Sequence, residues 1–337
     1  MSIEITVIEW VDNGVTLLDQ TLLPLEEVNL RITTVTQMID AIQRLAVRGA
    51  PALGVAGAYG VVIAMDEGAR EGWTSAKLET AIDSLRDARP TAVNLAWAVN
   101  QVREIIPQGR EAVLAAALEI AAADKKSGTD MGNVGADWLI AKLGNKKLNL
   151  LTHCNTGSLA TTGTGTALGV IKELHARGNV NEVFADETRP LLQGSRLTAW
   201  ELAKCQIPYR IQPDGAAAMA ILSGKVDAAL IGADRIAVNG DTANKIGSLG
   251  VALACHIAGI PFLVVAPEST IDRSMNDGSQ IHIEIRGDDE VTHVGGRQVA
   301  PHGAKTFNPA FDVTPSKFVS VVITELRAYD IAGGETL

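Results

Sequence analysis

The spacing of apolar and polar residues changes along the chain. Residues 3–30 alternate between apolar and polar side chains around an Asp-Asn-Gly turn at 12–14, which predicts short antiparallel strands. Apolar residues then recur with helical spacing, and this predicts helices at 36–46, 51–65, 75–88, 91–106 and 110–142. The last helix is long enough to connect two domains. We predict a boundary near 144–147, with domains at 1–145 and 146–337.

Beyond that boundary, short apolar runs alternate with helical stretches, a pattern typical of a parallel sheet. The runs predict strands at 149–153, 182–185, 209–212, 228–231 and 262–266. Helices are expected to start near residues 158, 195, 215, 243 and 270. A final apolar run at 318–324 is a last strand or helix. The second domain is therefore predicted to have an α/β fold.

Composition excludes several classes of partner. The 337 residues carry a net charge of −10 and only 4% aromatic residues, so we expect no nucleic-acid partner. We find no apolar run of about 18 residues and expect no membrane span. The charged segment at 1–10 argues against a signal peptide and favours a cytoplasmic protein. Three scattered cysteines without CxxC spacing predict neither a disulfide framework nor a metal site.

Chemically useful side chains follow the predicted strands. Cys154 comes after the first strand, residues 186–189 after the second, and Asp234 after the fourth. The carboxyl ends of parallel strands share one edge, where ligands bind. A thiolate can remove a proton, and a carboxyl group in an apolar pocket can supply one. This pair would suit an isomerase. Cys154 as a small buried residue, and Asp234 as a turn or cap residue, remain open alternatives.

Two other patterns at the first strand are weaker. His153 adjoins Cys154, but neighbours on a strand point to opposite faces, so we expect no Cys–His nucleophilic pair. Gly163, Gly165 and Gly169 resemble a dinucleotide fingerprint. In that fingerprint the first glycine follows the strand directly. Here about ten residues intervene after His153, so we expect no nucleotide cofactor.

Three small polar segments could bind an anion. Arg48, Gly49 and Ala50 precede a predicted helix, Arg89 precedes the next one, and Asn244-Lys245 follow Asp241. Free N–H groups at a helix start together with a guanidinium can hold a phosphate. Each segment alone is more typical of a capped helix end with a solvated cation. Three in an acidic chain modestly favour a phosphorylated ligand.

Six ordered segments identify a resemblance that runs from about residue 8 to residue 325. They are RGAPALGVAGAYG (48–60), ARPTAVNLAWAV (88–99), LTHCNTGSLATTGTGTALGVI (151–171), ADETRPLLQGSRLTAWEL (185–202), IGADRIAVNGDTANKIGSLGVAL (231–253) and NPAFDVTP (308–315). The chain resembles the methylthioribose-1-phosphate isomerase family. The wider group includes ribose-1,5-bisphosphate isomerases and the non-catalytic regulatory subunits of the exchange factor for translation initiation.

This resemblance implies a Rossmann-like catalytic domain after a smaller N-terminal domain of antiparallel strands and helices. By motif, Cys154 and Asp234 match the catalytic base and the protonated acid. The matching substrate contacts are Arg48, Gly49, Ala50, Arg89, Gln193, Asn244 and Lys245. The resemblance implies a homodimer without cofactor or metal that acts in methionine salvage. Alternatives are an isomerase for ribose 1,5-bisphosphate or 5-deoxyribose 1-phosphate, or a non-catalytic regulatory subunit. A hydride shift instead of proton transfer also stays open.

Overall fold

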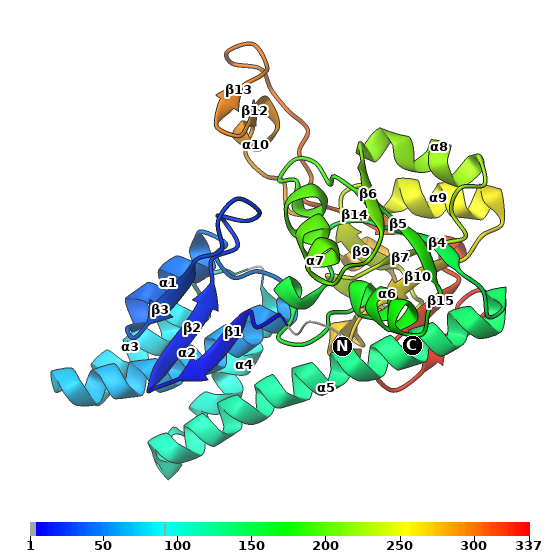
Figure 1. Ribbon diagram of the computed structural model, residues 1–337. Helices are drawn as coiled ribbons and strands as arrows, with labels where there is room; N and C mark the ends of the chain where they lie inside the picture. The colour runs from blue at the N-terminus through cyan, green and yellow to red at the C-terminus, as the bar shows by residue number, and fades with distance from the viewer. Residues whose placement is uncertain (1–4, 91) are drawn as a thin grey trace. The chain divides into compact units, whose positions relative to one another are not determined.

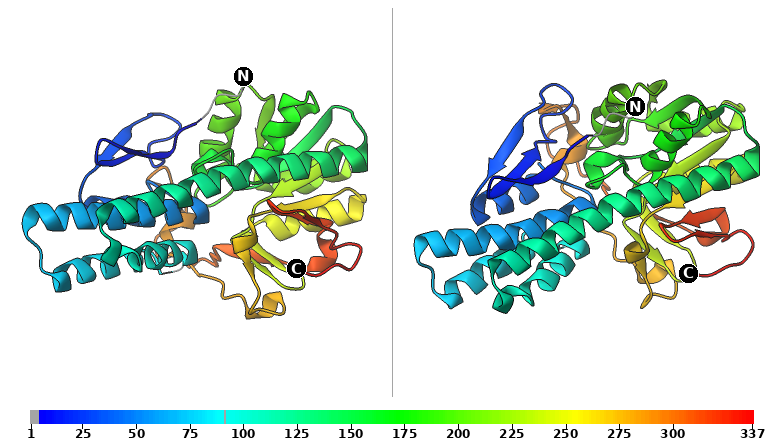
Figure 2. Two further views of the ribbon diagram at one scale, coloured as in Figure 1. Left: turned by 90° about the horizontal axis from the view of Figure 1, so that it is seen from below. Right: turned by 60° about the horizontal axis from the view of Figure 1, so that its bottom comes forward.

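The computed structural model describes residues 5–90 and 92–337 (Figure 1). The chain forms two compact units. The C-terminal unit comprises Thr129–Thr156 and Thr166–Leu337, and the N-terminal unit comprises the earlier described residues up to Gly128 together with Gly157–Gly165. The units divide within one helix, α5 (Arg110–Leu143), which Figure 2 shows as a continuous rod. The boundary predicted at 144–147 follows the end of this helix and stays a prediction.

The N-terminal unit begins with the predicted antiparallel strands. Strands β1 (Ile8–Val11), β2 (Gly14–Leu18) and β3 (Asn29–Ile32) form a three-stranded sheet in that order. Asp12 and Asn13 join β1 to β2 with φ angles of 45° and 57°, as a tight hairpin turn requires. Positions 3 and 4 of the predicted strand region lie outside the described residues.

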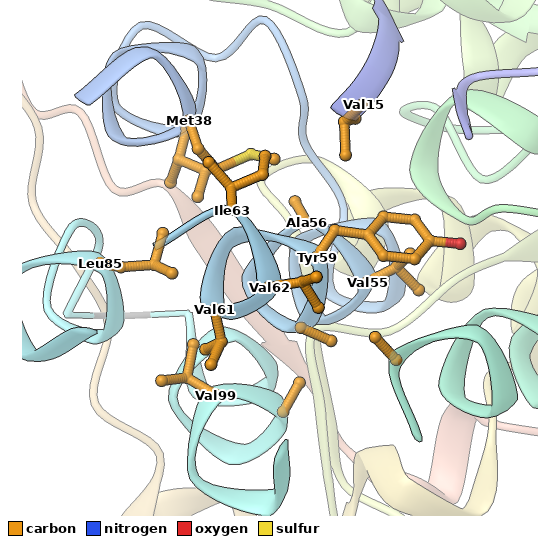
Figure 3. Close-up of a cluster of buried hydrophobic side chains, with 14 of the residues drawn as sticks. Val15, Met38, Val55, Ala56, Tyr59, Val61, Val62, Ile63, Leu85 and Val99 are labelled. Atoms are coloured by element: carbon orange, nitrogen blue, oxygen red, sulfur yellow. The ribbon is translucent and has the colours of Figure 1, made fainter. Parts of the chain in front are cut away.

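Helices of the N-terminal unit pack around α2 (Ala50–Glu71). Its neighbours are α1 (Val35–Gln43), α3 (Ser75–Arg86), α4 (Val93–Arg103) and the first part of α5, with a 3-10 turn, η1, at Ile106–Gln108. Figure 3 shows α2 surrounded by Met38, Leu85 and Val99. The predicted helix start at residue 91 lies outside the described residues.

The predicted length of helix α2 was wrong. Within the described residues, α2 is long and apolar enough to cross a membrane by length and composition alone. Its most apolar window is 78% buried inside the structure, which is the property of a core helix. The sequence pattern predicted a helix of 15 residues, whereas the structure has 22. The apolar run continues because α2 is covered on most of its sides.

The C-terminal unit is built on a seven-stranded sheet, which confirms the predicted parallel arrangement. Six strands are parallel, in the order β15-β10-β7-β4-β5-β6, and β16 (Ala328–Tyr329) adds an antiparallel edge. The parallel strands are β4 (Leu148–Thr152), β5 (Val180–Asp186), β6 (Tyr209–Gln212), β7 (Ala228–Ile231), β10 (Phe262–Val265) and β15 (Val321–Ile323). If the six parallel strands are numbered in chain order and read across the sheet from β6 to β15, their order is 3-2-1-4-5-6. This order is the Rossmann topology.

Helices cover both faces of this sheet. On one face, Leu150 and Leu230 pack with α6 (Ala167–Ala176), α7 (Ala199–Lys204) and the last part of α5. On the other face, Leu151 packs with α8 (Ala217–Leu222) and α9 (Ser248–Ala258). Both faces of each central strand are therefore apolar, as a doubly covered parallel sheet requires.

A second, four-stranded sheet follows β7 and overturns two predicted helix starts. Its order is β11-β8-β9-β14. The strands are β8 (Arg235–Ala237), β9 (Thr242–Lys245), β11 (Ile271–Asp272) and β14 (Phe311–Thr314). The helix expected to start near residue 243 begins later, at Ser248 of α9 (Ser248–Ala258), because β9 occupies the predicted start. Near residue 270 there is no α-helix in the described chain, only the 3-10 turn η5 (Glu268–Thr270) followed by β11. β9 pairs with β14, which lies about seventy residues later and cannot be read from local spacing.

The other predicted helix starts have mixed outcomes. The starts near 195 and 215 are confirmed by a π-helical turn, η3 (Gly194–Thr198), that leads into α7, and by a 3-10 turn, η4 (Asp214–Ala216), that leads into α8. The start near 158 was wrong, because only a 3-10 turn, η2 (Ser158–Ala160), forms there and α6 starts at Ala167. The remaining short elements are η5 (Glu268–Thr270), η6 (Gly278–Gln280), α10 (Asp289–Thr292), β12 (His293–Val294), β13 (Arg297–Gln298) and η7 (Ser316–Phe318).

Candidate active site

The order of the parallel strands reverses between β4 and β7. These two strands are hydrogen-bonded neighbours, with Thr152 opposite Leu230. Cys154 lies just after β4, and Asp234 lies just after β7. The reversal of strand order opens a crevice beyond the carboxyl ends of such strands, and ligands bind there in open α/β sheets. The fold therefore brings the two predicted catalytic segments to the same point of one sheet edge.

Cys154 is buried and has an unusual backbone. Cys154 is 6% exposed, and its φ angle is +64°, in the left-handed region. A non-glycine residue there costs about 1–2 kcal/mol, so surrounding contacts must hold it. Its N–H donates to Thr188 Oγ1 at 2.9 Å, and its carbonyl accepts from Thr198 Oγ1 at 2.6 Å. The backbone of Cys154 is thus tied to two later segments of the chain.

The two other cysteines lie at helices α7 and α9. Cys255 is buried in α9, and burial raises the pKa of its thiol to about 12. Burial also raises the pKa of the half-buried Cys205 thiol. Both thiols are therefore neutral near pH 7.

His153 does not pair with Cys154, as predicted. Its Nδ1 lies 2.9 Å from Asp186 Oδ2, and its Nε2 lies 2.9 Å from the carbonyl oxygen of Ile246. Gln212 Nε2 donates to the other Asp186 oxygen at 2.8 Å. Burial by itself lowers the pKa of His153. The hydrogen bond and charge of Asp186, together with the charge of Asp214 and the hydrogen bond to the Ile246 carbonyl, outweigh burial, and the pKa of His153 is raised.

The group His153, Asp186 and Asp214 has ligand atoms within 4.8 Å of one another, close enough for a metal ion. These atoms are already engaged. His153 binds Asp186, and Asp214 accepts the backbone N–H groups of Thr188 and Arg189 at 2.7 and 2.6 Å. The group therefore serves as a hydrogen-bonded connection between the ends of β4, β5 and β6.

Asp234 is held by its backbone and exposed at its side chain. Its N–H donates to the Ala243 carbonyl at 2.9 Å, which ties the loop after β7 to β9. The residue itself is exposed. Its surroundings do not supply the apolar burial that we expected for a protonated acid, so that protonation state stays a prediction.

Asn244 and Lys245 lie on β9 and are buried. Asn244 Nδ2 donates to Ser248 Oγ at 2.8 Å. Lys245 Nζ donates to the Ala310 carbonyl at 2.7 Å and lies 4.4 Å from the centre of the Phe311 ring. These two contacts hold the ammonium group of Lys245 in a fixed orientation.

Gln193 immediately precedes the π-helical turn η3. Gln193 is 5% exposed, and its Oε1 atom has no hydrogen-bond partner among the described residues. Such buried, unsatisfied oxygens are rare in proteins. The next residue, Gly194, approaches the Asp186 carbonyl so closely that an added Cβ would lie 1.6 Å from its oxygen. Only glycine fits there, and the close approach places Gln193 beside the end of β5.

In the N-terminal unit, Arg48, Gly49 and Ala50 form the start of α2. Gly49 is the N-cap with φ +90°, and a Cβ at this position would lie 2.2 Å from the Ala160 carbonyl oxygen. Arg48 is half-buried. The first N–H groups of a 22-residue helix provide the partial positive charge that favours an anion.

Arg89 was predicted to lie directly before a helix. It is half-buried, and α4 begins four positions later at Val93. The N-cap of α4 is Ala92, which makes no side-chain capping bond. Arg89 accepts the N–H of Ala92 through its carbonyl at 2.9 Å, so it still lies in the turn that leads into the helix.

Several residues near Cys154 were missed by the sequence interpretation. Four of them hold the ends of β4 and β5: Thr188, Thr198, Asp214 and Gln212. The fifth is Asp312, which accepts the N–H groups of Gly247 and Leu249 at the start of α9. The strand-end position of 186–189 pointed to the first of them. The others make contacts over long sequence separations, for which the pattern contains no signal.

The fold and the site together define an α/β protein of Rossmann topology with a candidate ligand site at the switch point of its sheet. The chain belongs to the initiation factor 2 subunit family, whose profile matches residues 46–329. This family membership covers most of the chain and confirms the predicted resemblance.

Relatives within this family are named as isomerases. A methylthioribose-1-phosphate isomerase of Nitrosococcus oceani is 46% identical over 96% of this chain and 93% of the relative. A 5-deoxyribose 1-phosphate isomerase of Moorella thermoacetica is 48% identical over 94% and 92%. A probable bifunctional methylthioribose-1-phosphate isomerase/methylthioribulose-1-phosphate dehydratase of Nocardia farcinica is 50% identical, and this chain spans only 57% of its length.

Solved structures of related proteins have the same fold as this chain. The 5-methylthioribose 1-phosphate isomerase of Pyrococcus horikoshii OT3 has a TM-score of 0.89 at 37% identity, covering 96% of this chain and 92% of that chain. Translation initiation factor eIF-2B, subunit delta, from A. fulgidus has a TM-score of 0.86 at 38% identity, covering 97% and 96%. The predicted fold class is therefore confirmed.

Proposed function

We propose that this protein is an aldose–ketose isomerase that converts 5-methylthioribose 1-phosphate into 5-methylthioribulose 1-phosphate, a reaction of methionine salvage. The names of relatives 46% and 37% identical support the activity. The observation that carries the proposal is the placement of Cys154 and Asp234 after two neighbouring strands at the switch point. A base and an acid on either side of one small ligand are what such a reaction needs.

The substrate sets the chemistry. Its anomeric carbon carries a phosphate ester, so the ring does not open spontaneously to a free aldehyde. Asp234, in its protonated form, donates a proton to the ring oxygen as the bond between that oxygen and C1 breaks. Cys154, as thiolate, removes the proton from C2, and the electron pair of that C–H bond forms the C1–C2 double bond of an enol. The Cys154 thiol then returns a proton to C1 while the C2 hydroxyl gives its proton to the Asp234 carboxylate, which yields the ketose 1-phosphate. Each proton transfer contributes about 10²–10⁴-fold to the rate.

The other predicted residues have binding roles in this proposal. Arg48, Gly49, Ala50 and Arg89 bind the phosphate, because guanidinium groups and helix N-termini favour anions. Asn244 and Lys245 bind sugar hydroxyls. Gln193 is suited to accept a hydrogen bond from a sugar hydroxyl, since its Oε1 has no partner among the described residues. A ligand hydroxyl there would satisfy this buried oxygen.

A second substrate is supported by a specific relative. The Moorella thermoacetica protein at 48% identity is named for 5-deoxyribose 1-phosphate. That sugar differs from the first only at C5, where hydrogen replaces the methylthio group. The reacting atoms and the phosphate are the same, so the same residues would act on both. Ribose 1,5-bisphosphate is a third substrate of this class and would need a further cation at C5.

A side-by-side assay of the three sugars tests the proposed function. Ketose formation is measured with purified protein at equal substrate concentrations. The largest kcat/KM is expected for 5-methylthioribose 1-phosphate, and Cys154→Ser is the inactive control. A larger kcat/KM for one of the other two sugars would reassign the substrate. No turnover with any of them would favour a non-catalytic regulatory protein like the eIF-2B subunits of the same fold.

We also propose that the protein is a cytoplasmic homodimer, as the family resemblance implies. Light scattering on the purified protein is expected to give about twice the monomer mass. A monomer with full isomerase activity would contradict the dimer without affecting the assigned reaction.

A further inference from the structure

Two residues with left-handed backbones meet at the candidate site. Cys154 has φ +64° and Thr188 has φ +63°. For a β-branched residue such as threonine this conformation is an outlier, and it persists only where the surroundings hold it. The two residues are hydrogen-bonded to each other, because the Cys154 N–H donates to Thr188 Oγ1 at 2.9 Å.

Thr188 is itself held from two sides. Its hydroxyl donates to the Asp186 carbonyl at 3.0 Å, so the oxygen that accepts from Cys154 has a fixed orientation. Its N–H donates to Asp214 Oδ1 at 2.7 Å, and the next N–H, that of Arg189, donates to Asp214 Oδ2 at 2.6 Å. Thr188 is fully buried. Asp214, just after β6, therefore fixes the turn that presents the Thr188 hydroxyl.

Thr198 holds the other side of the Cys154 peptide. Its hydroxyl donates to the Cys154 carbonyl at 2.6 Å. Thr198 closes the π-helical turn η3 and is 1% exposed. π-Helical turns are rare and frequently occur at functional sites. Both polar backbone groups of Cys154 are thus bonded to buried threonine hydroxyls.

We propose that Thr188 and Thr198 are positioning residues that hold Cys154 in its left-handed conformation and so aim its thiol. A hydroxyl can donate and accept at once, and serine keeps this property while valine keeps only the shape of threonine. The proposal rests on the assignment of Cys154 as the base. It adds two residues that act through the cysteine backbone and do not touch the substrate.

A purely structural role makes a different prediction. Buried backbone groups need partners in any case, and the two threonines could merely supply them. Their loss would then lower stability without changing the reactivity of the Cys154 thiol. The rate and pH profile of thiol alkylation separate the two roles, because they report on the thiol and not on the unfolding equilibrium.

The experiment compares Thr188→Val and Thr198→Val with Thr188→Ser and Thr198→Ser. The matched control is Thr314→Val, since Thr314 is fully buried and its Oγ1 has no hydrogen-bond partner among the described residues. Iodoacetamide alkylation of Cys154 is followed by mass spectrometry of its peptide from pH 6 to pH 10, together with kcat and KM. The peptide measurement excludes signals from Cys205 and Cys255.

We expect each valine variant to change the Cys154 alkylation rate at pH 7 about tenfold or more, with a displaced pH profile. In each, kcat should fall about tenfold or more while KM changes by less than about threefold, as for a group that acts only on the reacting step. The serine variants should stay within about threefold of the unmodified protein, and Thr314→Val should be unchanged.

Valine variants that fold and show unaltered alkylation and kcat would overturn the proposal. If neither valine variant folds, Asp214→Asn takes their place, because it weakens the support of Thr188 while both hydroxyls remain. It should change the alkylation rate of Cys154, and an unaltered rate would again overturn the proposal. Alkylation does not depend on turnover. An active Cys154→Ser variant would therefore refute the proposed catalytic base separately from the positioning roles.

Discussion

His153 and Asp186 form a buried pair across the ends of β4 and β5, with Nδ1 2.9 Å from Oδ2. Both side chains are 1% exposed. The second imidazole nitrogen faces the Ile246 carbonyl, which can only accept a hydrogen bond. Burial raises the pKa of Asp186, and the charge of His153 opposes that rise. Protonated His153 therefore satisfies both of its partners, and the pair connects the segment before Cys154 to the turn after Lys245.

This pair predicts a pH-dependent contribution to stability. The pKa of His153 is raised in the folded protein above its ordinary value of about 6.5. The contribution is fully present below about pH 6.5 and is lost as the pH rises through the folded pKa. The free energy of unfolding of the native protein should therefore fall, relative to a His153→Asn/Asp186→Asn double variant, between pH 6.5 and pH 9. The slope can reach about 1.4 kcal/mol per pH unit.

The double variant is used because it removes both titrating groups and leaves no unpaired buried carboxylate. His302→Asn is the control, since His302 is exposed. Urea unfolding at several pH values measures the difference. A difference that stays constant from pH 6.5 to pH 9 would contradict the protonated state of His153.

The assigned acid and base predict two inactive variants that still fold. Cys154→Ser replaces a thiolate by a much weaker base, and Asp234→Asn removes the transferable proton. Each should lower kcat by about 100-fold or more. Circular dichroism and the unfolding midpoint should be nearly unchanged for Asp234→Asn, because its side chain is exposed. Near-normal turnover by either variant would remove that residue from the mechanism.

Proton transfer and hydride shift give different products in deuterated water. Removal of the C2 proton by Cys154 allows exchange with solvent before C1 is reprotonated, so deuterium is expected at C1 of the ketose. Proton NMR of the product measures this incorporation. Complete retention of the C2 hydrogen at C1, without any solvent label, would favour the hydride shift.

The phosphate-binding role predicts a KM effect at Arg89. Arg89→Ala should raise KM about tenfold with a smaller change in kcat, because the phosphate is bound equally in the ground state and the transition state. Arg86→Ala is a matched control from the same segment, since Arg86 already pairs with Asp83 and Asp87. Equal KM values for the two variants would speak against phosphate binding by Arg89.

The start of α2 requires glycine. Gly49→Ala places a Cβ 2.2 Å from the Ala160 carbonyl oxygen at φ +90°, so it should destabilise the protein by about 3 kcal/mol or more. Gly72→Ala, at the other end of α2, has φ +66° with nothing within 4 Å of the added Cβ. It should cost only about 1–2 kcal/mol. Equal unfolding midpoints for the two variants would contradict the close approach at Gly49.

Local patterns in the sequence determined much of this protein. Alternation and helical spacing predicted the hairpin at 12–14, the five helices of the first half and five of the six parallel strands, because these patterns reflect which side of each segment is buried. The sixth strand, β15, lies in the run at 318–324, which the pattern left open as a strand or a helix. The position of Cys154 after β4 and of Asp234 after β7 followed from the same strands. The six motifs then supplied the family and its reaction.

The tertiary structure alone decided how these pieces meet. The strand order that makes β4 and β7 neighbours, the pairing of β9 with β14, and the bonds from Thr188 and Thr198 to Cys154 join residues tens of positions apart. The strands β9, directly before α9, and β11 were not predicted for this reason, since a segment with weak local preference takes the structure that its distant partner imposes. Periodicity describes which face of a segment is buried, whereas a site depends on what lies against that face.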